Sequence, residues 1–230
     1  TVALPHGSER AMVSYVPPAD GEPLADAIPW ERARRVSHLH IGGWTEGERA
    51  LDDQREILTA AAERGITTSL DVSWQQEPAL AERIRAVLSC VDLFVPNAAE
   101  ACWVAETDDV ETALDRLAEI VPTVVIKLGG DGAIARSGER VERVAGHDVT
   151  VVDTTGAGDA FAAGFLHGHI RRWPLARSLA LANVCGALSV ARIGSSISVP
   201  TRREAFTALE RGIAAVLDPP QAVAEAGSPP

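Results

Sequence analysis

Asp153-Thr-Thr-Gly-Ala-Gly-Asp159-Ala-Phe-Ala-Ala-Gly164 is the most informative stretch of this 230-residue chain. The β-branched run 149–152 before it predicts a strand, Gly156-Ala-Gly158 predicts a tight turn, and the apolar pattern from Asp159 onward predicts a helix. A glycine turn that leads into a helix leaves several backbone N–H groups without partners at one point, where the helix dipole also favours negative charge. The stretch therefore predicts an anion-binding site that suits a phosphoryl group.

Asp159 follows the glycines directly and would hold a carboxylate beside this anion site. At that place it can take the proton of a hydroxyl that attacks the phosphorus in line, which is the role of a general base. The alternative interpretation is that Asp159 caps its helix and the glycines only turn the chain. An isolated Gly-x-Gly-Asp pattern favours the alternative, whereas the longer context of the stretch favours the site.

Short β-branched runs alternate with longer segments rich in Ala, Leu, Glu and Arg along most of the chain. This alternation is typical of βαβ units and predicts an α/β fold with a mostly parallel sheet and helices on both faces. The predicted strands are 36–41, 67–72, 93–96, 124–128, 133–136 and 149–152. The predicted helices are 45–64, 77–90, 98–105, 110–120, 159–169, 174–190 and 202–217. Ligands bind beyond the carboxyl ends of the strands in such sheets, so we expect the chemistry in loops that follow strands.

The two ends of the chain differ from this pattern. Residues 2–4 and 11–15 flank a polar turn and predict an antiparallel hairpin, which we interpret as part of a lid. Residues 218–230 contain few large apolar side chains and predict a disordered tail. The expected organisation is a partial lid-like hairpin in residues 1–25, an α/β domain in residues 26–217, and the tail in residues 218–230.

The composition argues against several classes of partner. The formal net charge is −11 and no run of Lys or Arg could neutralise several phosphates, so we expect no nucleic-acid partner. No apolar segment reaches the roughly 18 residues of a membrane span, and the N-terminus lacks the pattern of a signal peptide. The three cysteines are odd in number and widely spaced, which favours reduced thiols. We expect a cytoplasmic protein with no membrane partner.

Residues 153–165, DTTGAGDAFAAGF, resemble the C-terminal signature of the PfkB/ribokinase family of carbohydrate and nucleoside kinases. Segments 96–100, 125–133 and 186–194 resemble other features of the family and stand in the family's order. The resemblance covers the chain from Thr1 to about Leu217. It implies a three-layer ribokinase-like fold with a small β lid remnant, in which residues 26–217 form the nucleotide-binding and catalytic domain.

The activity that this resemblance implies is an ATP-dependent transfer of the γ-phosphoryl group to a hydroxyl of a sugar, a nucleoside or a similar small molecule. Asp159 would be the catalytic base, and the backbone N–H groups of Gly156, Ala157 and Gly158 would form the anion hole. A non-catalytic nucleotide-binding or regulatory relative of sugar kinases remains the alternative. A Rossmann-type dehydrogenase is excluded, because Phe161 stands where that motif requires a third small residue.

Asn97 and Glu100 match the Asn-x-x-Glu motif of the family, which the resemblance assigns to arranging Mg²⁺ and phosphate through bound water. The same two residues fit a capping box, and the two interpretations are compatible. Lys127 is the only lysine of the chain and ends a predicted strand. It either contacts phosphate or is a solvated strand end. A P-loop is excluded, since Lys127 is not followed by Ser or Thr.

The turn with Gly129, Gly130 and Gly132 resembles the nucleotide-side loop of the family, in which small residues let a purine approach the backbone. Asn183 occupies a helix position that in this family often lies near the adenine or the ribose. From its own sequence context it is a helix-surface residue. Both motifs would therefore contribute to binding ATP if the resemblance holds.

Asp153 and Thr155, with the segment near Gly194, resemble the monovalent-cation site of many ribokinase-like enzymes. The resemblance implies that K⁺ can bind there and stiffen the turn beside the anion hole. His38 and His40 face the same side of a predicted strand, but no third ligand accompanies them, so the sequence does not favour a metal site there.

The front of the chain departs from the family. Its members begin with a further segment that supplies the first strand, glycine-rich and acidic contacts to the sugar, and part of the lid. We expect either a fragment or a naturally shortened protein. Asp71 ends a strand as the family's acidic position does, but Val72 and Ser73 replace the usual proline and asparagine. A homodimer is a hypothesis, because the apolar strand 11–15 would expose a sheet edge.

Overall fold

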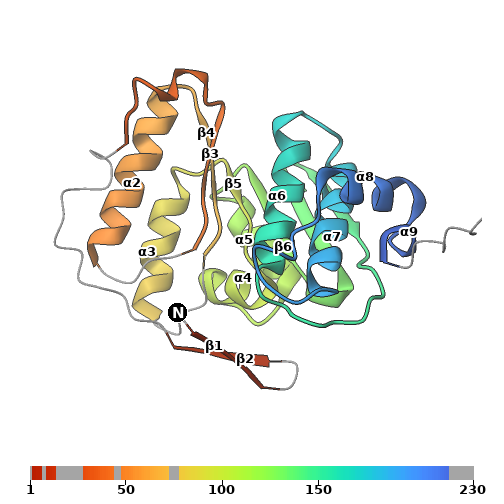
Figure 1. Ribbon diagram of the computed structural model, residues 1–230. Helices are drawn as coiled ribbons and strands as arrows, with labels where there is room; N and C mark the ends of the chain where they lie inside the picture. The colour runs from red at the N-terminus through yellow and green to blue at the C-terminus, as the bar shows by residue number, and fades with distance from the viewer. Residues whose placement is uncertain (1, 7–8, 14–27, 44–47, 73–77, 218–230) are drawn as a thin grey trace, which may run out of the picture.

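A computed structural model of the chain describes residues 2–6, 9–13, 28–43, 48–72 and 78–217. Its centre is a six-stranded sheet in the order β3-β4-β5-β6-β7-β8 (Figure 1). The strands are β3 (His38–Ile41), β4 (Thr67–Leu70), β5 (Leu93–Phe94), β6 (Thr123–Lys127), β7 (Ala133–Ser137) and β8 (Arg140–Val144). The pairs from β3 to β6 are parallel, whereas β7 and β8 pair antiparallel. The mostly parallel sheet is confirmed.

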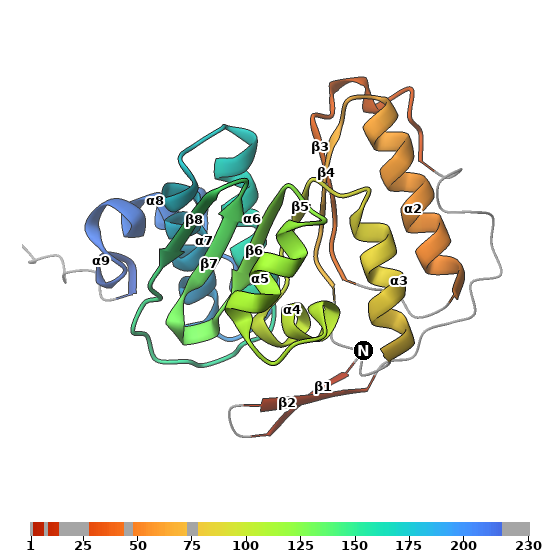
Figure 2. The same ribbon diagram turned by 180° about the vertical axis from the view of Figure 1, so that it is seen from behind.

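Helices cover both faces of this sheet and make three layers (Figures 1 and 2). One face carries α2 (Glu48–Glu63), α3 (Pro78–Leu88), α4 (Ala98–Ala105) and α5 (Val110–Ala118), which share one buried core with the strands. The other face carries α6 (Ala157–Ile170) and α7 (Leu175–Val190), which share a second core with the strands. Outside them lie α8 (Arg202–Arg211) and α9 (Ala214–Leu217).

Strand β6 shows why the central strands are apolar on both sides. Val124 and Ile126 point into the core under α4 and α5, whereas Val125 points into the core under α6 and α7. Successive side chains of a strand point to opposite faces, so a strand between two helix layers needs an unbroken apolar run. The run ends at Lys127, where the strand reaches the edge of the core.

The small residues of the signature stretch let α6 and α7 approach closely. A Cβ atom at Gly164 would lie 2.9 Å from Cα of Ala182, and a Cβ atom at Gly168 would lie 2.4 Å from Oγ of Ser178. Side chains larger than hydrogen would push the two helices apart. The packing of α6 against α7 therefore depends on these two glycines, which fix the direction from which α6 enters the site.

Two predicted elements are wrong. Residues 149–152 form no strand; Val151 is 60% exposed and the N–H of Val152 bonds to the carbonyl of Val190. The sixth strand is β8, which follows β7 after a turn at Gly138 with φ +58°. The predicted helix 202–217 is divided in two by Gly212, where φ is +88°.

At the N-terminal end, β1 (Val2–His6) and β2 (Glu9–Val13) form a separate antiparallel hairpin, as the sequence predicts. It lies apart from the six-stranded sheet in both views (Figures 1 and 2). The role of this hairpin as a lid stays a prediction. The predicted tail 218–230 lies outside the described residues. Within the described ranges, none of the helices combines the length and the apolar character that a membrane crossing requires.

Candidate active site

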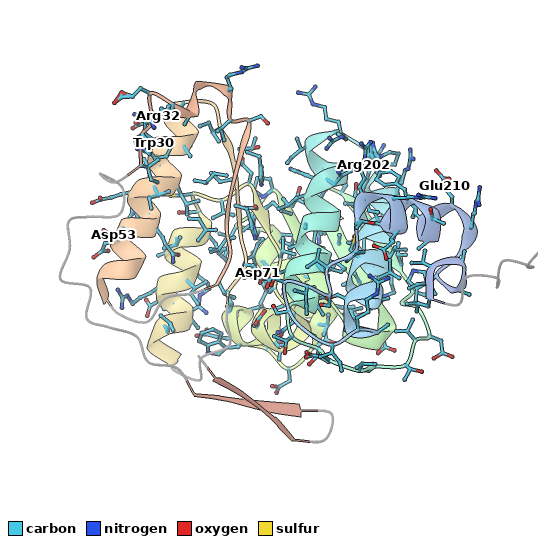
Figure 3. All side chains as sticks on the ribbon, in the orientation of Figure 1. Trp30, Arg32, Asp53, Asp71, Arg202 and Glu210 are labelled. Carbon is cyan, nitrogen blue, oxygen red and sulfur yellow. The ribbon has the colours of Figure 1, made fainter. Side chains whose placement is uncertain are left out.

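The carboxyl ends of three neighbouring strands meet the start of α6. Asp71 directly follows β4, Asn97 follows β5, and Lys127 ends β6. Asn97 and Lys127 form an isolated parallel bridge, and the N–H of Asp71 bonds to the carbonyl of Ile41, so these strand ends remain in register. Figure 3 shows the Asp71 side chain near the middle of the molecule. This is the edge at which a parallel sheet binds its ligands.

Lys127 and Asp71 form an ion pair at this edge. The distance from Nζ of Lys127 to Oδ2 of Asp71 is 2.7 Å, and the two side chains are only 14% and 10% exposed. The second carboxylate oxygen of Asp71, Oδ1, is buried and accepts no hydrogen bond from the described residues. Burial raises the pKa of Asp71, although the Lys127 ammonium opposes the rise. Lys127 is therefore not the solvated strand end that one interpretation of the sequence suggests.

The same ammonium lies beside the first turn of α6. A Cβ atom at Gly158 would be 3.4 Å from Nζ of Lys127. Gly156 caps the helix with φ +78°, and a Cβ atom there would lie 2.8 Å from Oγ of Ser195. A left-handed conformation and this close approach both require glycine. The turn thus brings the positive end of the helix dipole and the charge of Lys127 together.

The donors at this turn are not equivalent. The N–H of Ala157 bonds to the carbonyl of Thr154 at 3.3 Å. The N–H groups of Gly156, Gly158 and Asp159 donate to no acceptor within the described part of the chain. Such unpaired donors at a helix start are suited to bind anionic oxygen atoms. The exposed side chain of Asp159 belongs to the same turn and brings a carboxylate to the rim of the anion site.

Asp153 joins this turn to the segment that follows α7. Its Oδ1 accepts a hydrogen bond from the N–H of Thr155 at 2.9 Å, and its Oδ2 accepts one from the N–H of Gly194 at 3.0 Å. The N–H of Asp153 bonds to the carbonyl of Val190. The three residues that the sequence assigns to a K⁺ site therefore lie together, and their oxygen atoms are the donor type that a hard cation takes.

Asn97 and Glu100 form the capping box of α4 that the sequence predicts. Oδ1 of Asn97 accepts from the N–H of Glu100 at 2.8 Å, and Oε2 of Glu100 accepts from the N–H of Asn97 at 2.7 Å. Glu100 is buried. The bridge between Asn97 and Lys127 places this cap beside the end of β6, and the oxygen atoms of both side chains are of the type that Mg²⁺ binds.

The turn between β6 and β7 packs against the segment that follows β8. Gly132 has φ +92°, and a Cβ atom there would lie 2.1 Å from the carbonyl oxygen of Val144. A Cβ atom at Gly146 would lie 2.2 Å from the carbonyl oxygen of Gly130. Gly129 begins the same turn, a single turn of 3-10 helix. The bare backbone that the sequence predicts for a nucleotide-side loop is therefore present, and Gly146 belongs to it as well.

Asn183 is not a helix-surface residue, because it is only 6% exposed. Its Nδ2 donates to the carbonyl oxygens of Val144 and Ala145, each at 3.0 Å. The amide thus holds the segment after β8 against α7. The role of Asn183 in binding ATP stays a prediction.

Comparison with known proteins decides the family. The family model for the pfkB family of carbohydrate kinases matches residues 5–202. The chain belongs to this family. An uncharacterised sugar kinase of Archaeoglobus fulgidus is 29% identical over 178 residues, which are 76% of this chain and 69% of that protein. An ATP-dependent ribose-1-phosphate kinase of Halopiger xanaduensis is 32% identical over 177 residues, which are 76% of this chain and 55% of that protein.

A solved structure of a ribokinase II from E. coli, in complex with ATP and Mg²⁺, superposes on this pfkB-family chain with a TM-score of 0.74. It is 26% identical and covers 81% of this chain and 63% of its own. The ribokinase-like fold is therefore confirmed. The chain spans between about half and two thirds of the length of these three relatives.

The structure places the predicted residues of this pfkB-family chain in three groups. The first is the turn at the start of α6 with Asp153, Thr155 and Gly194. The second is Lys127 with the capping box of α4. The third is the glycine turn after β6 with Asn183, which reaches it through the segment after β8. Lys127 links the three groups, because its Nζ lies beside Gly158 and the strand that it ends leads through Leu128 into the glycine turn.

Two residues were missing from the predicted site: Asp71, the partner of Lys127, and His40. Both Asp71 and Asp159 affect the pKa of His40, so groups from β3, β4 and α6 lie near one another. The signals for them are weak in the sequence. Asp71 ends a predicted strand as the family's acidic position does, and His40 stands in a predicted strand, but neither pattern assigns a partner or a role. Among the described residues, no cluster of three or more His, Cys, Asp or Glu side chains is arranged to hold a metal ion.

Proposed function

We propose that this chain forms the nucleotide-binding and catalytic part of an ATP-dependent kinase that phosphorylates a hydroxyl of a sugar or sugar-like small molecule. The observation that carries the proposal is the meeting of three groups at one strand edge: the Lys127 ammonium, the unpaired N–H groups at the start of α6, and the Asp159 carboxylate. A cation and helix N–H groups bind a transferring phosphoryl, and an adjacent carboxylate can take a proton.

The proposed reaction assigns each group one role. The acceptor oxygen attacks the γ-phosphorus of ATP, the bond from this phosphorus to the β–γ bridging oxygen breaks, and ADP leaves. Asp159 takes the proton of the acceptor hydroxyl as the new O–P bond forms. Lys127 and the N–H groups of Gly158 and Asp159 stabilise the charge on the equatorial oxygens. Asp71 keeps Lys127 in place, and Gly156 gives the turn its shape.

Cofactor binding follows from the oxygen donors around this centre. Asn97 and Glu100 would hold Mg²⁺ through bound water, and Mg²⁺ supplies charge neutralisation on the phosphates when it is bound. Asp153, Thr155 and the segment at Gly194 would hold K⁺ beside the turn. The adenosine part of ATP would lie along Gly129, Gly130 and Gly132, on the far side of Lys127 from β3. Asn183 supports that wall.

The test measures ADP release by the purified chain with Mg-ATP, K⁺ and a panel of pentoses, hexoses, their phosphates and nucleosides. We expect one acceptor to stimulate ADP release. Asp159→Asn keeps the size of the side chain and should lower the rate roughly a hundredfold or more, because it removes the base. A chain that binds ATP but releases no ADP with any acceptor would instead be a fragment or a non-catalytic nucleotide-binding relative, and the panel repeated with an N-terminal segment restored would separate the two.

Two further expectations belong to this proposal. The three cysteines are free thiols, which supports a cytoplasmic location. A homodimer through the exposed edge of the β1–β2 hairpin remains a hypothesis. Size-exclusion chromatography with light scattering should give twice the mass of the chain, and a single-chain mass at all concentrations would contradict the dimer.

A further inference from the structure

Two histidines of β3 are linked to β4 by a continuous chain of hydrogen bonds. Oγ of Ser69 lies 2.8 Å from Nε2 of His38 and 2.7 Å from Nδ1 of His40. Nδ1 of His38 lies 2.8 Å from Oγ1 of Thr67. Both histidines point to the face of the sheet that α6 covers, where the His38 ring lies 5.9 Å from the ring of His169. His169 is half-buried at this contact.

The direction of each hydrogen bond follows from the backbone carbonyl at which this series of hydrogen bonds ends. Oγ1 of Thr67 lies 3.0 Å from the carbonyl oxygen of Ser37, which can only accept, so Thr67 donates there and accepts from Nδ1–H of His38. A neutral His38 then has a bare Nε2, which accepts from the hydroxyl of Ser69. Ser69 in turn accepts from Nδ1–H of His40. The network therefore leaves a lone pair on Nε2 of His40.

This assignment requires both histidines to be neutral at neutral pH. Burial, with smaller effects from neighbouring histidines, lowers the pKa of His38 to about 4. Burial also lowers the pKa of His40; Asp71 from the end of β4 and Asp159 from α6 oppose this, and Lys127 from β6 adds to it. Both rings therefore carry no charge at pH 7, and the order of donors and acceptors holds.

Nε2 of His40 points toward the edge of the sheet where the proposed chemistry occurs. Gly42 lies two residues after His40, and a Cβ atom at Gly42 would be 3.3 Å from Nε2 of His40. Nε2 makes no hydrogen bond with the residues that the structure describes. The glycine turn after β6 lies on the other side of Lys127. Because the nucleotide is proposed to lie along that glycine turn, the acceptor molecule would bind on the side of Asp159 that faces β3.

We propose that His40 is an acceptor-binding residue: its Nε2 accepts a hydrogen bond from a hydroxyl of the substrate other than the one that is phosphorylated. This inference rests on the proposed function and adds a requirement for the substrate, which must carry a second hydrogen-bond donor on the β3 side. The chain of hydrogen bonds ends on a backbone carbonyl, which cannot take up a proton. Ser69, His38 and Thr67 therefore position His40 and do not carry a proton away.

The test uses the acceptor that the ADP-release panel identifies, together with its monodeoxy analogues. The unaltered chain should disfavour one analogue roughly tenfold or more in kcat/KM, because that analogue leaves Nε2 unpaired. His40→Leu should raise the KM for the parent acceptor roughly tenfold or more and abolish the discrimination. The KM for ATP should stay within about twofold of its original value, since Nε2 makes no contact on the nucleotide side.

Further variants separate binding from folding. His40→Gln retains an acceptor oxygen near the position of Nε2 and should restore part of the discrimination. Ser69→Ala leaves the ring but releases its orientation, so it should raise the KM for the acceptor by a smaller factor. His167→Leu makes the same chemical change near the other end of α6 and should have no effect on either KM. If His40→Leu does not fold, Ser69→Ala and His40→Gln carry the test.

Each outcome decides between the two proposals. If the unaltered chain phosphorylates an acceptor and both His40 variants keep its KM and its discrimination, the role of His40 is wrong and the kinase stands. If no panel member stimulates ADP release either by this chain or by the chain with an N-terminal segment restored, the proposed function is wrong and the role of His40 falls with it.

Discussion

The Lys127 ammonium lies 2.7 Å from the Asp71 carboxylate and next to Gly158 at the start of α6. A buried ion pair contributes little net stability, because both charges lose their water, but loss of one partner leaves the other unpaired at a high cost. Here the pair fixes a cation at the place where a polyphosphate is expected. In the proposed reaction Asp71 would act on a bound anion only through Lys127. The pKa of Asp71 is raised chiefly by burial.

Lys127→Met should lower the free energy of unfolding by roughly 3–5 kcal/mol, because it leaves the Asp71 carboxylate buried without a cation. The double variant Asp71→Leu/Lys127→Met should recover most of this loss, since it removes both charges. Both variants should bind ADP at least about tenfold more weakly, because both lack the ammonium. Denaturant unfolding and calorimetric titration measure the two quantities. A double variant as unstable as the single one would contradict the pairing.

The first turn of α4 combines a helix cap with a proposed Mg²⁺ contact, and one substitution separates them. Glu100→Gln retains an oxygen that can accept the N–H of Asn97, so the capping box and the melting temperature should change little. The loss of a carboxylate should raise the Mg²⁺ concentration needed for half-maximal ADP binding roughly tenfold. Asn97→Ala removes the cap and should cost about 1 kcal/mol of stability. A Mg²⁺ requirement unchanged by Glu100→Gln would refute the metal role.

The contact between α6 and α7 depends on Gly164. Gly164→Ala places a Cβ atom 2.9 Å from Cα of Ala182, and backbone atoms cannot yield as a flexible side chain does. We expect a net loss of roughly 1–3 kcal/mol, even though alanine is the better helix former. Ala163→Val adds bulk at the exposed neighbouring position and should cost less than about 0.7 kcal/mol. Thermal unfolding of both variants compares the two sites, and equal losses would mean that the close approach is not the cause.

At the level of elements, the sequence predicts long apolar runs well and pairing poorly. The strand at β6 and the helix α4 are confirmed because an unbroken apolar run and a capping box mark them. The predicted strand at 149–152 is wrong because β-branched residues also suit an extended connection. Strand β8 was not predicted, because Arg and Glu stand between its two valines and it has no continuous apolar run. The pair of Asp71 with Lys127 joins residues 56 positions apart. The amino-acid sequence does not show directly which strands become neighbours in the sheet, so it does not show which strand ends meet.

On the scale of the whole molecule, the sheet separates two sides of the proposed reaction. The glycine turn after β6 and the segment after β8 lie at one end of the sheet, and His40 lies on β3 at the other. Between them, β4, β5 and β6 bring Asp71, the α4 cap and Lys127 to the same edge. Parallel strands present all their carboxyl ends at one edge, so this arrangement follows from the fold. A nucleotide on one side and an acceptor on the other would meet at Asp159.

Buried histidines should make the stability of the whole molecule fall as the pH is lowered. Five of the six histidines have a pKa below the ordinary value of about 6.5, chiefly through burial: His38, His40, His147, His167 and His169. The unfolded chain therefore binds more protons than the folded chain as the pH falls below about 6.5. These histidines therefore lower the free energy of unfolding as the pH falls through this range, and for His38 the decrease continues to its folded pKa of about 4.

His38→Asn should flatten the fall in melting temperature between about pH 6.5 and pH 4, because it removes one of these titrating groups. Glu204→Gln serves as the control, because it removes a group that titrates in a lower pH range than His38. Hydrogen bonds from Arg192 and Thr201 lower the pKa of Glu204 to about 2, so its contribution is complete above its ordinary pKa of 4.5 and is lost as the pH falls toward 2. The control should therefore leave the slope above pH 4.5 unchanged. Parallel curves for His38→Asn and the unaltered chain across that range would show that the ring is already protonated in the folded state. Nε2 of His38 would then donate to Ser69, and Ser69 would donate to Nδ1 of His40, which would place the proton of His40 on Nε2.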